Sequence, residues 1–410
     1  MNSIKIQYPN KLDKIFDKLN KNGIKIILVG GYVRDSLLEI ESKDIDIELF
    51  NLKSFLLLEE ILNEFGDINS VGKSFGVCKL RYKEFDLDFS LPRTDSKHSK
   101  GHKGFHIDID TTLDFKKAAS RRDFTINSMG YDIREEKLLD PFNGLQDLKS
   151  SLIKAVDLKK FGEDPLRVLR AIQFASRFKF KIDETLFIEC KNMIQNNILE
   201  ELPKERIFTE LQKLLLKSTQ PSRGLELAKK LNISQYFGEY LNLVMLDYYA
   251  LHKSGEEKVD IVIFLSLLYS KTTLYQLHTI TDKIKLTDTI RTLLEVENTF
   301  ILNSLSDYEL YKLATKVNIK LFLLYLDAKY LGEKKREIQK IRERARELNI
   351  LVTKAPAIIQ GRDIIALGLH PSKAFKKILS EAYTAQIKGL FKTEKEAYQW
   401  LKRYVQELNI

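Results

Sequence analysis

The sequence predicts an α+β head followed by a long, all-helical remainder, and three observations support this fold class. The chain has 410 residues, 44% of them hydrophobic, which is enough to build the cores of two to four domains. Before about residue 135, short alternating or apolar runs are typical of strands at 24–30, 44–50, 75–82 and 85–91. From about residue 145 strand signals nearly vanish, and apolar residues recur with the helical period to the end of the chain.

Two stretches are predicted to be loops or joints. Residues 92–105, PRTDSKHSKGHKGF, combine Pro, Ser, Gly and Lys, so we expect a mobile basic loop inside the head. Residues 351–363, LVTKAPAIIQGRD, carry Pro356 and Gly361 and are expected to separate a final module.

The composition limits the class of protein. Lysine and arginine exceed aspartate and glutamate by a net charge of +10, which favours a polyanionic partner, although a lysine-rich solvated surface explains it equally well. The two cysteines, Cys78 and Cys190, exclude a disulfide framework and a cysteine-based zinc site. The polar opening does not resemble a signal peptide, and the longest apolar run, 261–269, is far shorter than the ~20 residues of a membrane helix. A cytoplasmic protein without a membrane span is expected.

Gly30 and Gly31 end the first strand, and the residues that follow, YVRDSLLEI, have helical spacing. A glycine pair at such a turn lets the backbone approach a ligand, and the helix N-terminus offers N–H groups to a phosphate. Taken alone, the pair more often marks a tight turn without a ligand. Arg34 either reaches the same phosphate or pairs with its neighbour Asp35.

Asp44 and Asp46 form the strongest local signal. Because strands have a period of two, both carboxylates point to one face while Ile45 and Ile47 point into the core. Two close carboxylates repel, and each raises the pKa of the other unless a cation lies between them. Such hard oxygen ligands suit Mg²⁺, which proteins often hold with one or two carboxylates plus substrate phosphates. The alternative is an ordinary solvated strand face.

The strand FDLDFSL repeats this pattern, with Asp86 and Asp88 on one face. If it pairs beside strand 44–50, Asp88 adds a third carboxylate to a two-metal site, in which ions about 3.5–4 Å apart stabilise the attacking and leaving oxygens. Asp86 is expected to be a solvated residue without a role.

Several motifs, in order, resemble one family. VGGYVRD followed by KDIDIE resembles the nucleotidyltransferase signature of the polymerase-β-like superfamily. RRDFTINSMGYD, LLDPFNGLQDL, GEDPLRVLRAIQFASRF and LPKERIFTELQKLL narrow the resemblance to the bacterial class II tRNA nucleotidyltransferase and poly(A) polymerase family. The resemblance implies a polymerase-β-like head with a mixed sheet, then a helical neck, body and tail. The expected ranges are 1–140, 141–217, 218–350 and 351–410.

The resemblance also implies roles for residues of the head. Those expected to bind an incoming triphosphate are Gly30, Gly31, Arg34 and Arg122. Those expected to hold magnesium ions are Asp44 and Asp46, with Asp88 completing the catalytic site. Phosphoryl transfer requires mainly positioning and neutralisation of developing negative charge, which agrees with these residue types. Arg121 and Asp123, beside Arg122, fit a structural role equally well.

Asp164, Arg167 and Arg170 lie roughly on one side of a predicted helix. Their spacing alone favours an ion pair within the helix, between Arg167 and either Glu163 or Asp164. The resemblance instead implies that Asp164 and Arg167 read the base of the nucleotide. A carboxylate only accepts hydrogen bonds and a guanidinium only donates them, so this pair complements the amino group and ring nitrogen of cytosine or adenine. Guanine and uracil would leave buried polar groups unsatisfied, at about 1–3 kcal/mol each.

One position departs from the family pattern. Relatives usually have a further arginine one turn beyond Arg170, where this chain has Gln173. Glutamine keeps hydrogen-bond donors but lacks the charge and the fork geometry of arginine. Arg170 and Gln173 are still expected among the nucleotide-binding residues. Glu205 and Arg206 are expected to brace the base-reading helix, and loop 92–105 to serve a switch from C to A, unless it is an ordinary surface loop.

The resemblance therefore implies a template-independent nucleotidyltransferase that adds C and A to tRNA 3′ ends from CTP and ATP with Mg²⁺. The basic segment 332–349 would help to bind the tRNA acceptor arm, although a solvated helix face explains it equally well. A poly(A) polymerase, or an enzyme that adds only A or only CC, shares these motifs. A protein of another class, a catalytically silent tRNA-binding protein, is the remaining alternative. No His-Asp hydrolase motif is present, so no appended phosphohydrolase activity is expected.

Overall fold

The computed structural model describes residues 4–70, 72, 76–97, 105–233, 237, 243–302 and 305–408. The chain divides into two compact units, residues 1–234 and residues 235–410. The finer division into head, neck, body and tail stays a prediction.

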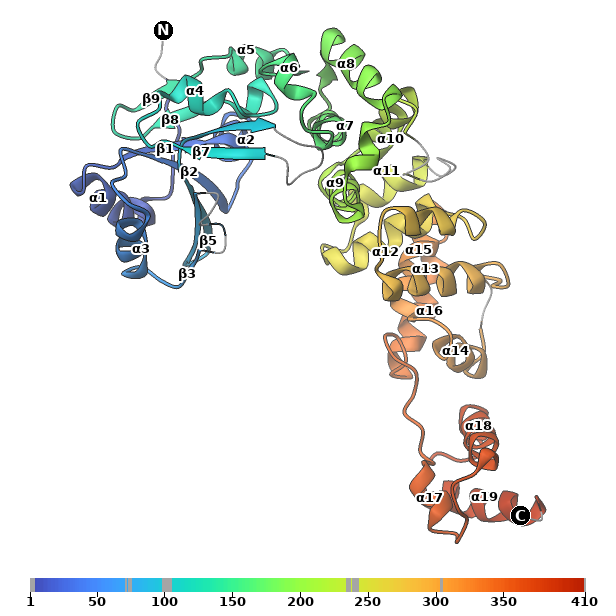
Figure 1. Ribbon diagram of the computed structural model, residues 1–410. Helices are drawn as coiled ribbons and strands as arrows, with labels where there is room; N and C mark the ends of the chain where they lie inside the picture. The colour runs from blue at the N-terminus through green and yellow to red at the C-terminus, as the bar shows by residue number, and fades with distance from the viewer. Residues whose placement is uncertain are drawn as a thin grey trace. The chain divides into compact units, whose positions relative to one another are not determined.

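A mixed seven-stranded sheet forms the head, with the strand order β3-β4-β5-β2-β1-β8-β9 (Figure 1). Strands β2 and β5 are parallel, and the other neighbouring pairs are antiparallel. The strands are β1 (Lys25–Val29), β2 (Asp44–Phe50), β3 (Ile68–Asn69), β4 (Val77–Tyr82), β5 (Phe85–Ser90), β8 (Gly130–Asp132) and β9 (Lys137–Leu139). The predicted α+β class with a mixed sheet is confirmed.

The alternation along β2 sorts its side chains onto the two faces of the sheet. Ile45 and Ile47 are fully buried in the core of the head. Asp44 is exposed and Asp46 is partly exposed, so both lie on the opposite face, as the period of two predicts. Helices α1 and α3 contact each other on one side of the sheet (Figure 1).

The stretch 92–105 differs from the expected loop. Residues Arg93–Lys97 form β6, which pairs antiparallel with β7, Phe105–Ile109. The two strands form a separate two-stranded sheet, so a ladder of backbone hydrogen bonds holds residues 93–97 and 105 of the expected loop. Its tip, residues 98–104, lies outside the described residues.

Helices surround and follow the sheet in the first unit. The α-helices are α1 (Asp13–Lys21), α2 (Gly30–Leu37), α3 (Phe55–Asn63), α4 (Phe115–Ala119), α5 (Gly144–Lys149), α6 (Leu158–Phe161), α7 (Leu166–Phe178), α8 (Glu184–Gln195), α9 (Lys204–Lys217) and α10 (Pro221–Lys230). The 3-10 helices are Asn10–Leu12, Thr125–Asn127 and Ile198–Glu201. Helix α7 packs against α9 and α10, which places its polar side toward the head. One departure from an all-helical neck is the short parallel pair β10 (Leu152–Ile153) and β11 (Lys181–Ile182).

The described part of the second unit is helical. Its α-helices are α11 (Leu243–His252), α12 (Glu257–Leu268), α13 (Ile284–Glu297), α14 (Asp307–Ala314), α15 (Ile319–Lys329), α16 (Lys335–Glu347), α17 (Gly361–Ile365), α18 (Lys373–Ile387) and α19 (Glu394–Glu407), with a 3-10 helix at Leu274–Thr279. The apolar run 261–269 is almost wholly buried in and beside α12, which contacts α13 and α15. Across the described ranges, no helix has the length and apolarity needed to cross a membrane. Helices α17 to α19 share a small core that includes Ile364, Ile378 and Leu401.

Candidate active site

The glycine turn brings three predicted site residues together. Strand β1 ends at Val29 and α2 begins at Gly30, whose φ of +64° lies in the left-handed region that favours glycine. A Cβ on Gly30 would lie 2.6 Å from Nη1 of Arg122, so a side chain has no room there. The N–H of Gly31 donates a hydrogen bond to Oδ2 of Asp46 over 3.2 Å. The Gly30–Gly31 turn, the carboxylate of Asp46 and the partly buried guanidinium of Arg122 therefore lie close together.

The register of the sheet aligns four carboxylates in two rows. Asp44 pairs with Asp86 and Asp46 pairs with Asp88 across the parallel strands β2 and β5. Partners in register point to the same face, so Asp88 lies beside Asp46, as the sequence hypothesis required. Burial raises the pKa of Asp46, with Arg122 opposing this effect and Asp88 adding to it. A cation next to Asp46 would therefore relieve an unfavourable charge.

Asp44 and Asp46 fit a divalent cation, whereas Asp88 already pairs with a lysine. Asp44 and Asp46 are hard oxygen donors on one face, which are the ligands that Mg²⁺ prefers. The Oδ2 atom of Asp88, however, lies 2.6 Å from the ammonium of Lys79 on β4. Within the described ranges, no cluster of three or more His, Cys, Asp or Glu side chains has the arrangement of a metal site. Two carboxylates, rather than three, are thus available in this structure.

A cleft of about 540 Å³ opens beside Asp46. It is lined by ten cationic and three acidic side chains, so it attracts polyanions strongly. The cationic residues are Arg34, Arg93, Arg121, Arg122, Arg167, Arg170, Arg177, Arg206, Lys213 and Lys217, and the acidic ones are Asp46, Asp123 and Asp164. Gly30, Gly31 and Gln173 also line the cleft, whereas Asp44 and Asp88 stand outside its lining.

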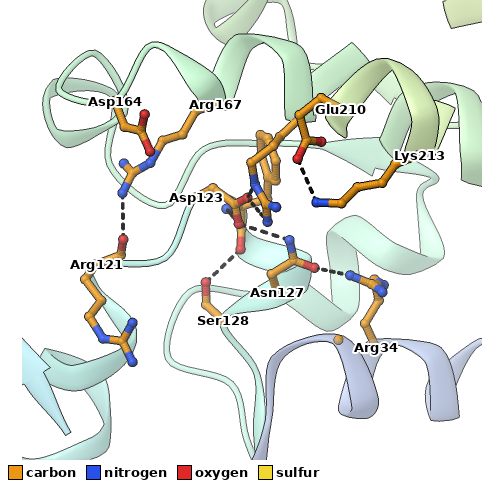
Figure 2. Close-up of polar contacts among 12 residues, drawn as sticks. Arg34, Arg121, Asp123, Asn127, Ser128, Asp164, Arg167, Glu210 and Lys213 are labelled. Carbon is orange, nitrogen blue, oxygen red and sulfur yellow. Dashed lines mark hydrogen bonds and ion pairs between the residues drawn. The ribbon is translucent and has the colours of Figure 1, made fainter. Parts of the chain in front are cut away.

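Arg34 is held rigidly in the wall of the cleft. Its guanidinium donates to Asp35 and to the side-chain oxygen of Asn127, and it lies 5.1 Å and 4.8 Å from the ring centres of Phe174 and Phe178 (Figure 2). Burial lowers the pKa of Arg34, and the adjacent Asp35 partly restores it. Arg34 therefore pairs with Asp35, as one interpretation of the sequence held, and it also lines the cleft, while its contact with a phosphate stays a prediction.

Arg170 is paired with a buried carboxylate. Its Nε and Nη2 atoms each lie 2.6 Å from Oδ2 of Asp123, which also accepts hydrogen bonds at Oδ1 from Asn127 and the N–H of Phe124 (Figure 2). Burial acts to raise the pKa of Asp123, but Arg170 and Asn127 outweigh it and the pKa is lowered. Burial likewise acts to lower the pKa of Arg170, but Asp123 and Glu210 outweigh it and the pKa is raised. Asp123 therefore anchors α7 to the head.

Arg167 does not form the ion pair within the helix that its spacing favoured. Its Nη1 and Nη2 atoms donate to the backbone carbonyls of Lys160 and Arg121, each over 2.7 Å. Asp164 accepts a hydrogen bond at Oδ1 from the N–H of Leu166, and its Oδ2 lies 3.7 Å from Arg206. Asp164 and Arg167 thus project side by side from the start of α7 (Figure 2).

Sequence reasoning missed charged residues that line the cleft or pair with its lining. Glu48 continues the two-residue period of Asp44 and Asp46, and this fully buried carboxylate accepts a hydrogen bond from Arg121 over 2.9 Å. Arg177 lies one turn beyond the buried Gln173 on α7 and pairs with Asp35 over 3.1 Å. The two-residue period of β2 could have indicated Glu48, and the helical period of α7 could have indicated Arg177.

Helix α9 supplies further missed residues. Lys213 lines the cleft and lies 2.7 Å from the buried carboxylate of Glu210, while Lys217 lies one turn further along the same helix. Arg206, expected to brace α7, faces Asp164, which agrees with a bracing role. Glu205 is exposed.

Comparison with protein families matches two parts of this chain. Residues 26–154 match the family described as "Poly A polymerase head domain", and residues 179–243 match "Probable RNA and SrmB- binding site of polymerase A". The CCA-adding enzyme of Lactococcus lactis subsp. cremoris is 34% identical over 236 residues, which is 56% of this chain and 56% of the relative. The multifunctional CCA protein of Neisseria meningitidis is 34% identical over 203 residues, which is 50% of this chain and 46% of the relative. The chain thus spans about half the length of these curated relatives.

Solved structures share the fold over almost the whole chain. The Bacillus stearothermophilus CCA-adding enzyme in complex with CTP has a TM-score of 0.75 at 22% identity, covering 98% of this chain and 100% of that one. The Thermotoga maritima CCA-adding enzyme complexed with tRNA has a TM-score of 0.59 at 22% identity, covering 99% and 100%. The family resemblance and the fold class predicted from the sequence are confirmed by these matches.

Proposed function

We propose that this protein, which carries a poly A polymerase head domain, is a template-independent nucleotidyltransferase that adds C and A to the 3′ end of tRNA from CTP and ATP. The observation that carries this proposal is the cationic cleft beside the glycine turn and the Asp44/Asp46 strand. A cleft with ten cationic side chains suits a triphosphate and the end of a nucleic acid better than any neutral ligand. Relatives named CCA-adding enzyme and multifunctional CCA protein support the choice of reaction.

Asp44 and Asp46 are the residues proposed to hold Mg²⁺. When bound there, the metal would neutralise charge on the triphosphate and on the attacking and leaving oxygens. The chain's own contribution is the rigid strand register, which fixes both carboxylates on one face, and the Gly31 N–H, which orients Asp46. Asp88 was expected to complete the site, and its pairing with Lys79 favours a supporting role.

The triphosphate is proposed to lie against the arginines near the glycine turn. Arg122 lies partly buried beside Gly30, and Arg34 and Arg177 share the carboxylate of Asp35. Guanidinium groups fixed before binding lose little freedom when they meet phosphate oxygens, so the attraction is used for positioning. The attacking group would be the 3′-hydroxyl of the RNA, and the leaving group pyrophosphate.

Asp164 and Arg167 are proposed to read the base. Arg167 is held by two backbone carbonyls, yet its Nη1 and Nη2 atoms each carry a second hydrogen that can be donated. Asp164 keeps acceptor capacity at Oδ2. The pair would complement cytosine or adenine, while guanine and uracil would leave groups unpaired. Gln173, buried and uncharged, lines the same cleft, and Arg177 supplies a charge one turn further on.

The RNA partner is proposed to be the acceptor arm of tRNA, bound through helices after the head. One solved relative is a complex with tRNA, and residues 179–243 match a probable RNA-binding model. In α16, the basic segment predicted to track phosphates, Arg344 is paired with Asp307 and Glu347. Other basic side chains of that helix would have to carry the contact. The cytoplasmic setting stays an expectation from the sequence.

One product analysis tests this function. Purified protein would be incubated with tRNA ending at the discriminator base, tRNA ending in C and tRNA ending in CC, each with CTP, ATP or both. We expect extension to CCA and then arrest. Unlimited A tails on unstructured RNA would instead identify a poly(A) polymerase, and arrest after CC or a single A a specialised enzyme. RNA binding without any incorporation would identify a silent binding protein.

A further inference from the structure

A cation of the chain itself lies in line with the carboxylates of the sheet. The β4–β5 register pairs Lys79 with Asp88, and the β2–β5 register pairs Asp88 with Asp46. Lys79, Asp88 and Asp46 therefore form one row across three adjacent strands. The ammonium of Lys79 is 2.6 Å from Oδ2 of Asp88, and their side chains are 58% and 39% exposed.

A second row lies two residues along the same face. Arg81 on β4 pairs in register with Asp86, which in turn pairs with Asp44. Both rows thus run from one cation through a central carboxylate to a carboxylate of β2. The strand alternation is the cause, because the charged residues of these rows stand two residues apart on β4, β5 and β2, while Leu80, Leu87 and Ile45 between them are buried. In the first row, Lys79 forms an ion pair with the central carboxylate, Asp88.

We propose that Lys79 is a positioning residue that withholds Asp88 from the metal site and so weakens divalent-cation binding to the protein without nucleotide. The inference rests on the proposed function, because it concerns the cation that Asp44 and Asp46 would hold. Its physical basis is twofold. Lys79 occupies an oxygen of Asp88 that a metal would otherwise use, and its positive charge lies within two strand spacings of that metal, about 9–10 Å.

The consequence is that the metal would arrive together with the triphosphate. Two carboxylates with a nearby ammonium form a weak site, whereas phosphate oxygens add the missing ligands. An exposed Lys–Asp pair contributes little to folding, so Lys79 can be replaced without loss of the sheet. If Lys79 had only a structural role, replacing it would leave the metal affinity of the protein unchanged.

The test is Mn²⁺ titration of the nucleotide-free protein, followed by the electron paramagnetic resonance signal of free Mn²⁺. Lys79→Met removes the charge at nearly constant length and is expected to tighten Mn²⁺ binding about ten- to thirtyfold. Removal of a unit charge near a dication contributes about three- to tenfold of this gain, and the release of Asp88 as a ligand contributes about threefold more. Lys79→Arg keeps the charge and should stay within about twofold of wild type. Lys5→Met removes an equally exposed pair, with Glu136, and should change nothing.

A double-mutant cycle separates the ligand effect from the charge effect. The gain from Lys79→Met should be at least about threefold larger with Asp88 present than in an Asp88→Asn background, because only Asp88 can become a ligand. Equal gains in both backgrounds, or no gain at all, would overturn the inference. The Asp46→Asn variant serves a separate purpose. If it binds Mn²⁺ as wild type does, the proposed metal site is wrong, independently of Lys79.

Discussion

The two sides of the cleft hold their charges in different ways. On the sheet side, Asp44 is exposed and Asp46 partly so, and burial raises the pKa of Asp46. On the helical side, the buried Asp123 pairs with the partly buried Arg170, and Arg34 is enclosed by Asp35, Asn127 and two aromatic rings. The helical side is thus organised without a ligand, whereas on the sheet side the pKa of Asp46 stays raised although Arg122 lies nearby, so its charge is balanced only in part. Substitutions on the two sides should therefore affect different quantities.

The largest effect is expected for Asp44→Ala on the sheet side. Loss of a metal ligand should lower the rate of nucleotide incorporation about 10³-fold or more, since a bound metal is worth several kcal/mol in the transition state. RNA affinity should be unchanged because Asp44 is exposed and outside the cleft lining. Single-turnover incorporation of labelled CTP and a filter-binding assay measure the two quantities. Asp86→Ala, in register on the neighbouring strand, is the matched control and should stay near wild type. An equal loss of incorporation in both variants would contradict a specific role for Asp44.

The next effect is expected in stability on the helical side. Asp123→Ala leaves the partly buried guanidinium of Arg170 without its hydrogen-bonded carboxylate, which should cost about 1–3 kcal/mol in the free energy of unfolding. Urea denaturation measures this value. The double variant Asp123→Ala/Arg170→Leu should recover much of the loss, because it removes the unpaired charge. If the double variant is no more stable than the single one, the pair does not anchor α7.

The same pair determines a pH dependence. Although burial raises it, the pKa of Asp123 is lowered overall from its ordinary 3.8 by Arg170 and Asn127. Its contribution to stability is therefore complete above that ordinary value and is lost as the pH falls through the lower, folded-state pKa. The stability gap between wild type and Asp123→Ala should be constant near neutral pH and should narrow only in acid. A gap that narrows between pH 6 and 8 would contradict this assignment.

A smaller effect is expected for base reading. Arg167→Ala should lower kcat/KM for CTP about ten- to a hundredfold, because an unsatisfied buried partner costs about 1–3 kcal/mol. Discrimination against UTP should fall with it, since the donors that select the base are lost. Arg134→Ala, an exposed arginine in the turn between β8 and β9, controls for general loss of positive charge. Unchanged discrimination by Arg167→Ala would move base reading to other residues.

The smallest effect is expected for the stability of Asp46→Asn. A raised folded-state pKa means that Asp46 favours the folded state only at low pH, and that this contribution is lost as the pH rises through the folded-state pKa. Without metal at neutral pH, the neutral variant should therefore melt slightly higher than wild type, and the difference should vanish in acid. Added Mg²⁺ should raise the melting temperature of wild type alone. A variant that melts lower at neutral pH would show that Asp46 is not strained by its charge.

Local patterns in the sequence predicted the sheet side well and the helical side poorly. The shared face of Asp44 and Asp46 follows from strand period alone, and it was predicted before any pairing was known. Whether Asp46 and Asp88 are neighbours depends on which strands pair and in which register, and contacts between distant segments set that register. The sequence therefore predicted this proximity only on the condition that the two strands pair. The pairing of β6 with β7 was missed because the Pro, Ser, Gly and Lys residues of the stretch 92–105 are typical of a loop.

On the helical side the decisive contacts join distant segments. Arg170 meets Asp123, Arg167 meets the carbonyl of Arg121, and Arg177 meets Asp35. Spacing along α7 favoured a local ion pair for Arg167, because a single helix offers only neighbours three and four residues away. Tertiary packing of α7 against the head supplied closer partners. The family resemblance placed Arg167 and Arg170 among the nucleotide-binding residues, but it did not predict which partners they take, and it did not include Arg177.

Anomalous diffraction from crystals grown with Mn²⁺ and CTP tests the central claim most directly. The account predicts an anomalous peak between the carboxylates of Asp44 and Asp46, with phosphate oxygens completing the coordination beside the Gly30–Gly31 turn. A peak elsewhere in the protein, or bound CTP with no metal at these two carboxylates, would contradict it.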